Sequence, residues 1–278
     1  MDSIADIVDS YKIFLEVKHA DHYSKYVKRE RGDPESARAE AVLFALFRRL
    51  TDSITVHEDP STGGPDFLCQ KERRNFLLEV ASLKAENVER ISGLKNTPSK
   101  RVRGSFSLIT HVLRNTASKK APQLSGSPMP RVLAVTTEHI DGSVLLGPDA
   151  AKTLLTSDTQ ITFPIDSPET PARIVTHLDD SVFFRFKKDG SVEPCRQSIS
   201  AILLIHILKE SCEIVGILHP EPSVSFDIDL LPEIPFLRIS NWPFRGTAIG
   251  LEWVIFAPKP PRLHYSRVKF QRGELTSY

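Results

Sequence analysis

The chain has 278 residues, a formal net charge of +1, 40% hydrophobic residues and 26% charged residues, a composition typical of a globular protein. This near-neutral balance excludes a basic surface spread over the whole molecule, so any contact with nucleic acid must be local. The three cysteines form no CxxC pair and lie in apolar runs, which predicts reduced core residues of a cytoplasmic protein. Without a long apolar run or a signal peptide, we expect a soluble protein with no membrane partner.

Residues 1–32 are expected to form an N-terminal helical segment that packs on the core. Ile4, Ile7, Tyr11 and Phe14 recur at helical spacing. The polar stretch that follows, residues 19–31, is predicted to be a solvated segment.

A second helix is predicted from Pro34 to about Leu50. Asp33 can cap it, and proline fits the first turn of a helix. Glu40 lies on the same stripe as three large apolar residues, Leu43, Phe44 and Phe47. This alignment predicts that Glu40 points toward the core. The alternative is a boundary position from which its carboxylate reaches solvent.

After a short strand at residues 54–56, the next feature is a hairpin of two apolar runs, residues 67–69 and 75–83. A turn centred on Glu72 and Arg73 would place Asp66 directly opposite Glu79, with Cβ atoms roughly 5 Å apart. Two facing carboxylates need a cation between them, and a hard divalent ion is the usual partner. The alternative is that Asp66 serves the preceding turn and Glu79 faces solvent. The second strand is apolar on both faces, which favours burial of Glu79.

From Arg90 to Arg131 the chain carries no acidic residue. Such local segregation of positive charge is typical of segments that bind phosphate backbones, although a solvated helix face would have the same composition. Residues 99–120 are predicted to be helical. The basic residues of the segment are Arg90, Lys95, Lys100, Arg101, Arg103, Arg114, Lys119, Lys120 and Arg131.

The remaining elements complete an α/β pattern. We expect strands at residues 131–137, 181–186, 199–207 and 214–218, a short helix at residues 148–155, and a loop at residues 156–180. His206 lies in an apolar run and is predicted to be a core residue. Residues 221–278 are rich in proline and aromatic side chains and are expected to pack on the core as an extension.

The pair Pro65-Asp66, followed after a hairpin by Glu79, resembles the motif of the PD-(D/E)XK nuclease superfamily. The resemblance implies a restriction-endonuclease-like mixed sheet flanked by helices, with residues 33–220 as the core. The motif of that superfamily ends in a lysine, and this chain has Ala81 at that position. In some members the lysine has moved to another element, and in others its loss marks an inactive, binding-only domain.

The resemblance also implies roles for individual residues. The first core helix of such proteins often supplies a glutamate to the metal site, here Glu40. Lys120 and Gln123 resemble a Lys-x-x-Gln element on the second core helix. The implied metal ligands for Mg²⁺ or Mn²⁺ are Glu40, Asp66, Glu79 and the carbonyl of Ala81. The implied nucleic-acid contacts are Lys100, Arg101, Arg103, Lys119 and Gln123.

Two functions follow as expectations. The first is a metal-dependent nuclease that hydrolyses phosphodiester bonds of DNA, or alternatively of RNA, with Asp66, Glu79 and Lys120 as catalytic residues. Lys120 is favoured over Lys84 as the displaced lysine, because Lys84 falls on the other face of the strand by parity. The second is a degenerate module that binds nucleic acid or protein without catalysis. A homodimer is compatible with either function.

Overall fold

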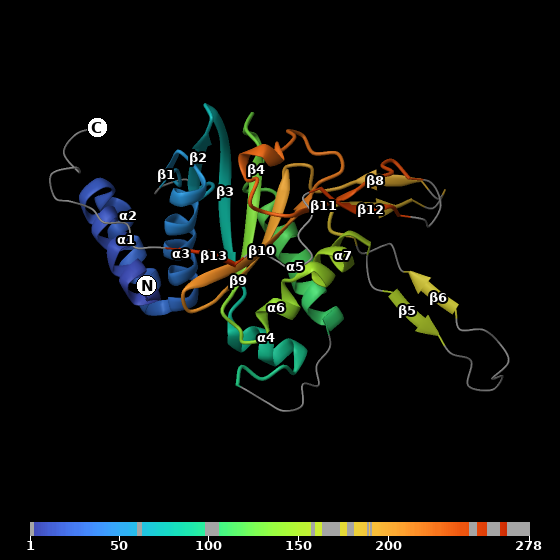
Figure 1. The fold of residues 1–278 in the computed structure, drawn as a ribbon, viewed down its shortest axis with the longest axis horizontal. Helices are drawn as coiled ribbons and strands as arrows, with labels where there is room; N and C mark the ends of the chain where they lie inside the picture. The colour runs from blue at the N-terminus through green and yellow to red at the C-terminus, as the bar shows by residue number, and fades with distance from the viewer. Residues whose placement is uncertain are drawn as a thin grey trace.

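The structure of this protein is a computed structural model that describes residues 3–59, 63–97, 106–156, 159–162, 173–176, 181–187, 189, 191–244, 249–254 and 262–265. It confirms an α/β protein, in which N-terminal helices accompany a large mixed sheet of nine strands and further helices (Figure 1). The predicted regions 99–105, 177–180 and 266–278 lie outside the described residues. No helix in the described part of the chain is both long and apolar enough to span a bilayer.

The helices are α1 (Ile4–Lys18), α2 (Ala20–Gly32), α3 (Pro34–Leu50), α4 (Ala85–Ser92), α5 (Phe106–Lys120), α6 (Gly142–Leu145) and α7 (Pro148–Thr156). The strands of the large sheet are β1 (Ser53–Val56), β2 (Phe67–Lys71), β3 (Arg74–Ser82), β4 (Arg131–Thr137), β9 (Ala201–Ile207), β10 (Ser211–Leu218), β11 (Phe236–Ile239), β12 (Leu251–Trp253) and β13 (Arg262–His264). Two small sheets consist of β5 (Thr159–Thr162) with β6 (Arg173–Thr176), and of β7 (Phe184–Phe186) with β8 (Val192–Pro194).

Helix α3 begins and ends where the sequence predicts. The side chain of Asp33 accepts a hydrogen bond from the Ser36 N–H (3.3 Å), which satisfies one of the unpaired donors of the first turn. Pro34 stands in that first turn, where its missing N–H has no cost. The apolar stripe of α3 is buried along its length, so packing as well as capping stabilises the helix.

The β2–β3 hairpin has the predicted register. Glu72 and Arg73 both adopt positive φ angles, 50° and 62°, as a tight two-residue hairpin turn requires. Lys71 pairs with Arg74, and the ladder ends at the pair of Phe67 with Leu78. The next position on each strand is Asp66 and Glu79, so these two residues face each other just beyond the last ladder pair.

The large sheet has the order β1-β2-β3-β4-β9-β10-β11-β12, and β13 pairs with the free part of β10. Strands β3, β4 and β9 are parallel, whereas β2–β3 and β9–β10 are antiparallel. Strands β4 and β9 are buried along their whole length, as expected for central parallel strands covered on both faces.

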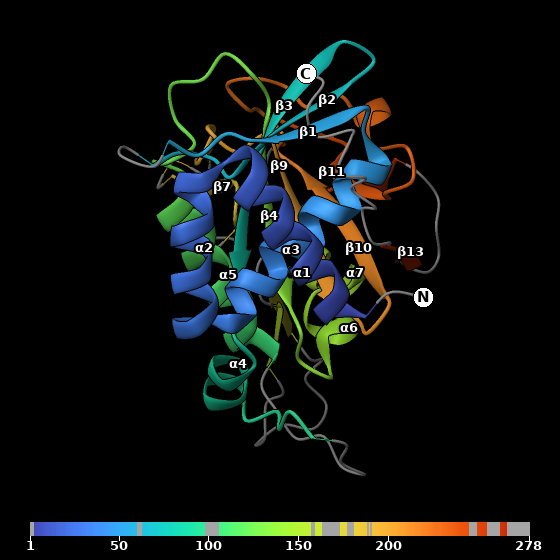
Figure 2. The same cartoon turned by 90° about the vertical axis from the view of Figure 1, so that its left-hand side faces the viewer.

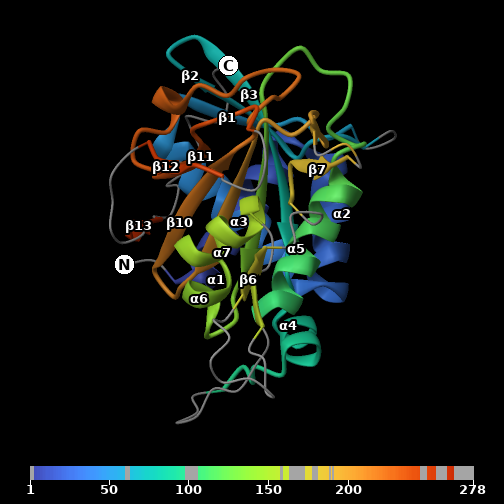
Figure 3. The same cartoon turned by 90° about the vertical axis from the view of Figure 1, so that its right-hand side faces the viewer.

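Two hydrophobic cores lie on the two faces of this sheet. Helices α1 and α3 pack on one face, together with Tyr26 of α2 and the side chains of Phe76 and Leu78 (Figure 2). Helices α5 and α7 pack on the other face against alternate residues of the same strands, such as Ala81 and Leu133 (Figure 3). Alternate residues of β3 therefore point into different cores, and Glu79 has the same parity as Ala81.

The structure adds to or differs from the sequence expectations at four places. Residues 20–32 form the helix α2, held by the buried ring of Tyr26, and are not a solvated segment. Residues 85–92 form the unpredicted helix α4. The expected loop at residues 156–180 contains β5 and β6. Residues 221–278 do more than cover the core, because β11, β12 and β13 extend the large sheet itself.

Candidate active site

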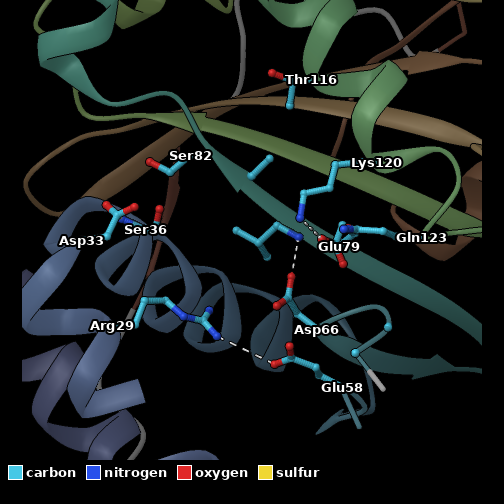
Figure 4. Close-up of a pocket in the computed structure, with 14 residues that line it drawn as sticks. Arg29, Asp33, Ser36, Glu58, Asp66, Glu79, Ser82, Thr116, Lys120 and Gln123 are labelled. Carbon is cyan, nitrogen blue, oxygen red and sulfur yellow. Dashed lines mark hydrogen bonds and ion pairs between the residues drawn. The ribbon is translucent and has the colours of Figure 1, made fainter. Parts of the chain in front are cut away.

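A pocket of about 730 Å³ lies beside the second half of β3 (Figure 4). Strand β2 pairs with β3 only as far as Leu78, so residues 79–82 of β3 have no β2 neighbour on that side. The strand stops there because Pro65 has no N–H to donate to the ladder. The described residues that line the pocket are Arg29, Asp33, Ser36, Glu58, Gly63, Gly64, Asp66, Glu79, Val80, Ala81, Ser82, Thr116, Lys120 and Gln123.

Asp66 holds the end of the hairpin and faces the pocket. Its Oδ2 accepts a hydrogen bond from the backbone N–H of Val80 (2.7 Å), and so replaces the ladder bond that β2 no longer supplies. The side chain is half-buried in the pocket wall, and the surrounding protein atoms desolvate it. This desolvation, together with the charges of Glu79 and Glu40, raises the pKa of Asp66 well above its ordinary value. A cation bound beside Asp66 would oppose this shift, because it favours the ionised carboxylate.

Glu79 is the more deeply buried carboxylate, with 3% of its surface exposed. Its Oε1 accepts a hydrogen bond from Lys120 Nζ (2.5 Å). Its Oε2 is buried and has no hydrogen-bond partner among the described residues. Burial raises the pKa of Glu79, although the lysine opposes this shift. A buried carboxylate oxygen without a partner is costly, so it points to a bound ligand that the protein atoms do not supply.

Lys120 lies at the end of α5 and reaches the pocket next to Ala81. Its side chain is about 29% exposed, and its ammonium forms an ion pair with Glu79, which is 41 residues away in the chain. Ala81 lines the same pocket, and its carbonyl accepts a long hydrogen bond from Thr136 Oγ1 (3.4 Å). The structure thus brings Lys120 of α5 and Ala81 of β3 to one pocket. Lys84 is elsewhere, in an ion pair with Asp33 (2.8 Å).

Glu40 points inward, as predicted, but it does not line the pocket. Its Oε1 accepts a hydrogen bond from the Tyr11 hydroxyl (2.9 Å), and its Oε2 pairs with the guanidinium of Arg29. Both carboxylate oxygens are therefore occupied by protein donors. Burial raises the pKa of Glu40, and Arg29 opposes that shift. Of the expected trio of Glu40, Asp66 and Glu79, only Asp66 and Glu79 line the pocket, while Glu40 forms an ion pair with Arg29.

The sequence analysis missed two residues of the pocket, Arg29 and Glu58. Arg29 comes from α2 and bridges two carboxylates, since its other amino group lies 3.8 Å from Glu58 (Figure 4). Glu58 lies two residues after the end of β1. The one signal for Arg29 was its spacing of three residues from Tyr26, which places both side chains on the inward face of a helix.

The basic segment does not form one continuous surface. Arg114 and Arg131 are buried, and Arg131 donates to the carbonyl of Leu124 (2.9 Å), so neither side chain is available to a phosphate. Lys119 is exposed outside the pocket, whereas Gln123 is exposed at the pocket rim. Lys100, Arg101 and Arg103 lie outside the described residues. Arg114 and Arg131 cannot contribute to a basic surface because the fold buries them, and composition alone does not reveal that burial.

The other singled-out residues are satisfied within the fold. His206 is a core residue as predicted, with Nδ1 3.0 Å from Ser143 Oγ and 3.7 Å from a Glu213 oxygen. All three cysteines are free thiols, and Cys69 and Cys212 are buried. None of these side chains is among the described residues that line the pocket.

The donors of the pocket fit a hard divalent cation of the Mg²⁺ type. In the described part of the chain, no group of three or more His, Cys, Asp or Glu side chains is arranged to hold a metal ion. Magnesium, however, is commonly bound by one or two carboxylates, with water and substrate phosphate completing its octahedron. Asp66 and Glu79 supply two carboxylates, and the unpartnered Oε2 of Glu79 is a ready ligand atom.

Neither a family model, nor a curated protein, nor a solved structure was found that matches the chain. What the site can do therefore has to be argued from its own residues.

Proposed function

We propose that the chain is a metal-dependent phosphodiesterase that acts on nucleic acid, with DNA favoured over RNA, on a restriction-endonuclease-like core. One observation carries this proposal, namely the pair of acidic residues, Asp66 and Glu79, that face one pocket. Both have raised pKa values, and the Oε2 atom of Glu79 is buried without a partner among the described residues. That oxygen lines the pocket with no protein donor among the described residues, so it is free to bind a cation.

Asp66 and Glu79 would hold Mg²⁺ or Mn²⁺. When bound, such an ion activates water and neutralises the charge that develops on the phosphate. Asp66 and Glu79 are costly to ionise in the buried site, and a bound cation would offset that free-energy cost because it favours their ionised forms.

Lys120 would position the attacking water. Its ammonium already lies 2.5 Å from Glu79, inside the pocket. Once Glu79 binds the ion, the Lys120 ammonium can donate to a water molecule or to a phosphate oxygen instead. Arg29, fixed between Glu40 and Glu58, would add a positive field in the same pocket. Gln123 at the rim can donate to a phosphate of the strand.

A nuclease assay with Mg²⁺, Mn²⁺ and EDTA tests this function. We expect cleavage of a DNA substrate with either metal and none with EDTA. Asp66→Asn and Glu79→Gln should each lower kcat on the order of 10²–10³-fold, because each removes a charge that acts on the transition state. Glu16→Gln, on the exposed face of α1, is the matched control and should cleave like the unmodified protein. Cleavage that is unaffected by both site variants would contradict the proposal.

A binding-only module is the second candidate, and the Lys120–Glu79 ion pair favours it. Two cations of the protein, Lys120 and Arg29, already stand beside the acidic residues, so the pocket is partly neutralised without metal. In this alternative the unmodified chain binds nucleic acid but shows no cleavage with either metal ion.

A further inference from the structure

A second hollow, of about 230 Å³, adjoins the pocket of Asp66 and Glu79. The two hollows share Ser82 of β3 and Thr116 of α5, so they adjoin each other at these two side chains. Figure 4 shows Thr116 on the opposite side of the pocket from Glu58. Four residues of α4 line the second hollow, and Figure 1 shows α4 at the end of the sheet opposite the β2–β3 hairpin.

The charges of the two hollows differ in sign. Four acidic residues, Asp33, Glu58, Asp66 and Glu79, line the first together with two basic residues, Arg29 and Lys120, so acidic residues are in excess there. Among the described residues, no acidic side chain lines the second, whose polar rim consists of Lys84, Asn87 and Arg90. Lys84 forms an ion pair with Asp33, whereas the Arg90 side chain is exposed. A polyanion that reaches the acidic pair therefore meets the positive charge of Arg90 on this side.

The walls of the second hollow are apolar. Val88, Ile91 and Val112 line it, and Val88 is buried. Apolar walls with a few polar groups at the rim are typical of sites for planar, partly polar ligands. A nucleobase is such a ligand, and the amide of Asn87 can both donate to and accept from its edge. Only an unpaired base can enter, because a paired base is stacked within the duplex.

We propose that this second hollow, the base subsite, receives the base of a nucleotide next to the scissile phosphate, so that the substrate is single-stranded or locally melted nucleic acid. The proposal rests on the phosphodiesterase function argued above. It commits to a polynucleotide strand as the occupant, because the hollow shares two lining residues with the acidic pocket and Arg90 gives its rim a positive charge.

A binding assay tests the base subsite. The probe is a fluorescein-labelled single-stranded oligothymidylate of about twelve nucleotides, and fluorescence anisotropy measures its Kd with Ca²⁺ in place of Mg²⁺. Val112→Trp fills the hollow and should raise the Kd about tenfold, the loss expected for one unstacked base. His111→Trp, on the exposed side of the same helix, is the matched control and should change the Kd less than about twofold.

Substitutions at two exposed positions test the base subsite even if Val112→Trp does not fold. Asn87→Ala and Arg90→Ala should each raise the Kd several-fold, whereas Arg49→Ala, on an exposed position of α3, should not. The unmodified protein should bind the single strand more tightly than a duplex of the same sequence. Equal effects of Val112→Trp and His111→Trp, a preference for duplex, or no binding of the oligonucleotide would each overturn the base subsite.

Hydrolysis of bis(p-nitrophenyl) phosphate with Mn²⁺ separates this proposal from the general function. That small diester needs only the acidic pocket, so the three variants of the base subsite and the two controls on α3 and α5 should leave its turnover unchanged. Failure of the unmodified protein to hydrolyse both this diester and DNA would contradict the phosphodiesterase function, while the anisotropy result would still decide whether the hollow binds an unpaired base.

Discussion

Asp66 should make the metal-free protein less stable at neutral pH. Its pKa is raised in the folded state, so the folded protein binds this proton more tightly than the unfolded chain does. The resulting cost is absent below the ordinary carboxyl pKa of about 4, grows as the pH rises toward the raised pKa, and is complete above it. Asp66→Asn removes this cost and can still accept the Val80 N–H.

We therefore expect the metal-free Asp66→Asn variant to have a higher free energy of unfolding than the unmodified protein at about pH 8, and a smaller advantage at about pH 4. Urea denaturation at several pH values measures the difference. Adding Mg²⁺ should narrow it at about pH 8, since the ion stabilises only the charged site. Parallel stability curves for the two proteins would show that Asp66 is not desolvated in this way.

Lys120 and Ala81 allow a rescue experiment. Lys120→Ala should lower kcat with Mg²⁺ by about a hundredfold, the usual scale for loss of one positioned group. Ala81→Lys in that variant should restore part of the activity, because residue 81 points to the same side of β3 as Glu79. In the unmodified protein Ala81→Lys should add little, since two ammonium groups would compete for one site.

Cleavage rates for the four combinations distinguish the two candidate functions. Activity that does not depend on Lys120 would rule out the displaced-lysine mechanism. Activity that is present only in the Ala81→Lys forms would instead identify a degenerate module whose chemistry was lost with the lysine.

At the scale of elements, an ion pair between Arg29 and Glu40 holds α2 against α3 beside the pocket. Arg29 and Glu40 join α2 to α3, and the Glu40 side chain is only about 11% exposed. Arg29→Ala would leave that carboxylate buried with the Tyr11 hydroxyl as its remaining described partner. Breaking a buried pair by removing one partner typically costs about 3–5 kcal/mol, and the partial exposure of Arg29 lowers this to about 2–3 kcal/mol.

Chemical denaturation of Arg29→Ala should show this loss, and the double variant Arg29→Leu with Glu40→Leu should recover most of it. Arg49→Ala, exposed on α3, is the control and should stay within about 0.5 kcal/mol of the unmodified protein. If the single and double variants lose the same free energy of unfolding, the pair is not the link between the two helices.

On the scale of the whole molecule, the described strands after residue 220, β11, β12 and β13, are part of the large sheet. Phe236 and Leu237 of β11 are buried on opposite faces of the large sheet. The ring of Phe236 packs against the backbone at Gly216 so closely that a Cβ there would lie 2.2 Å from it. Strand β11 therefore completes both cores, and β13 covers the remaining part of β10.

A chain that ends at residue 220 should consequently aggregate or unfold without a cooperative transition, because it exposes the faces that β11 covers. In the full chain, Phe236→Ala should lower the free energy of unfolding by about 3–5 kcal/mol, as expected for loss of a buried aromatic ring. Thermal unfolding followed by circular dichroism measures both. A soluble, cooperatively folding residue 1–220 fragment would contradict this assignment.

The sequence by itself determined the parts of the fold and site that depend on neighbouring residues. The hairpin turn at Glu72 and Arg73 sets the register, and the alternation of β3 then places Glu79 opposite Asp66. The cap of α3 and the apolar run of β4 are likewise local signals, and both elements lie where they were expected. These predictions succeeded because period and turn chemistry act over a few residues.

The tertiary structure decided which distant side chains share the site. Lys120 reaches Glu79, Arg29 enters the pocket, and Glu40 is held by Arg29 and Tyr11 instead of facing the pocket. The sequence also left open that Arg131 is internal and that β11 joins the large sheet. Each of these outcomes depends on how helices pack on a sheet across tens of residues, and local periodicity contains no information about that packing.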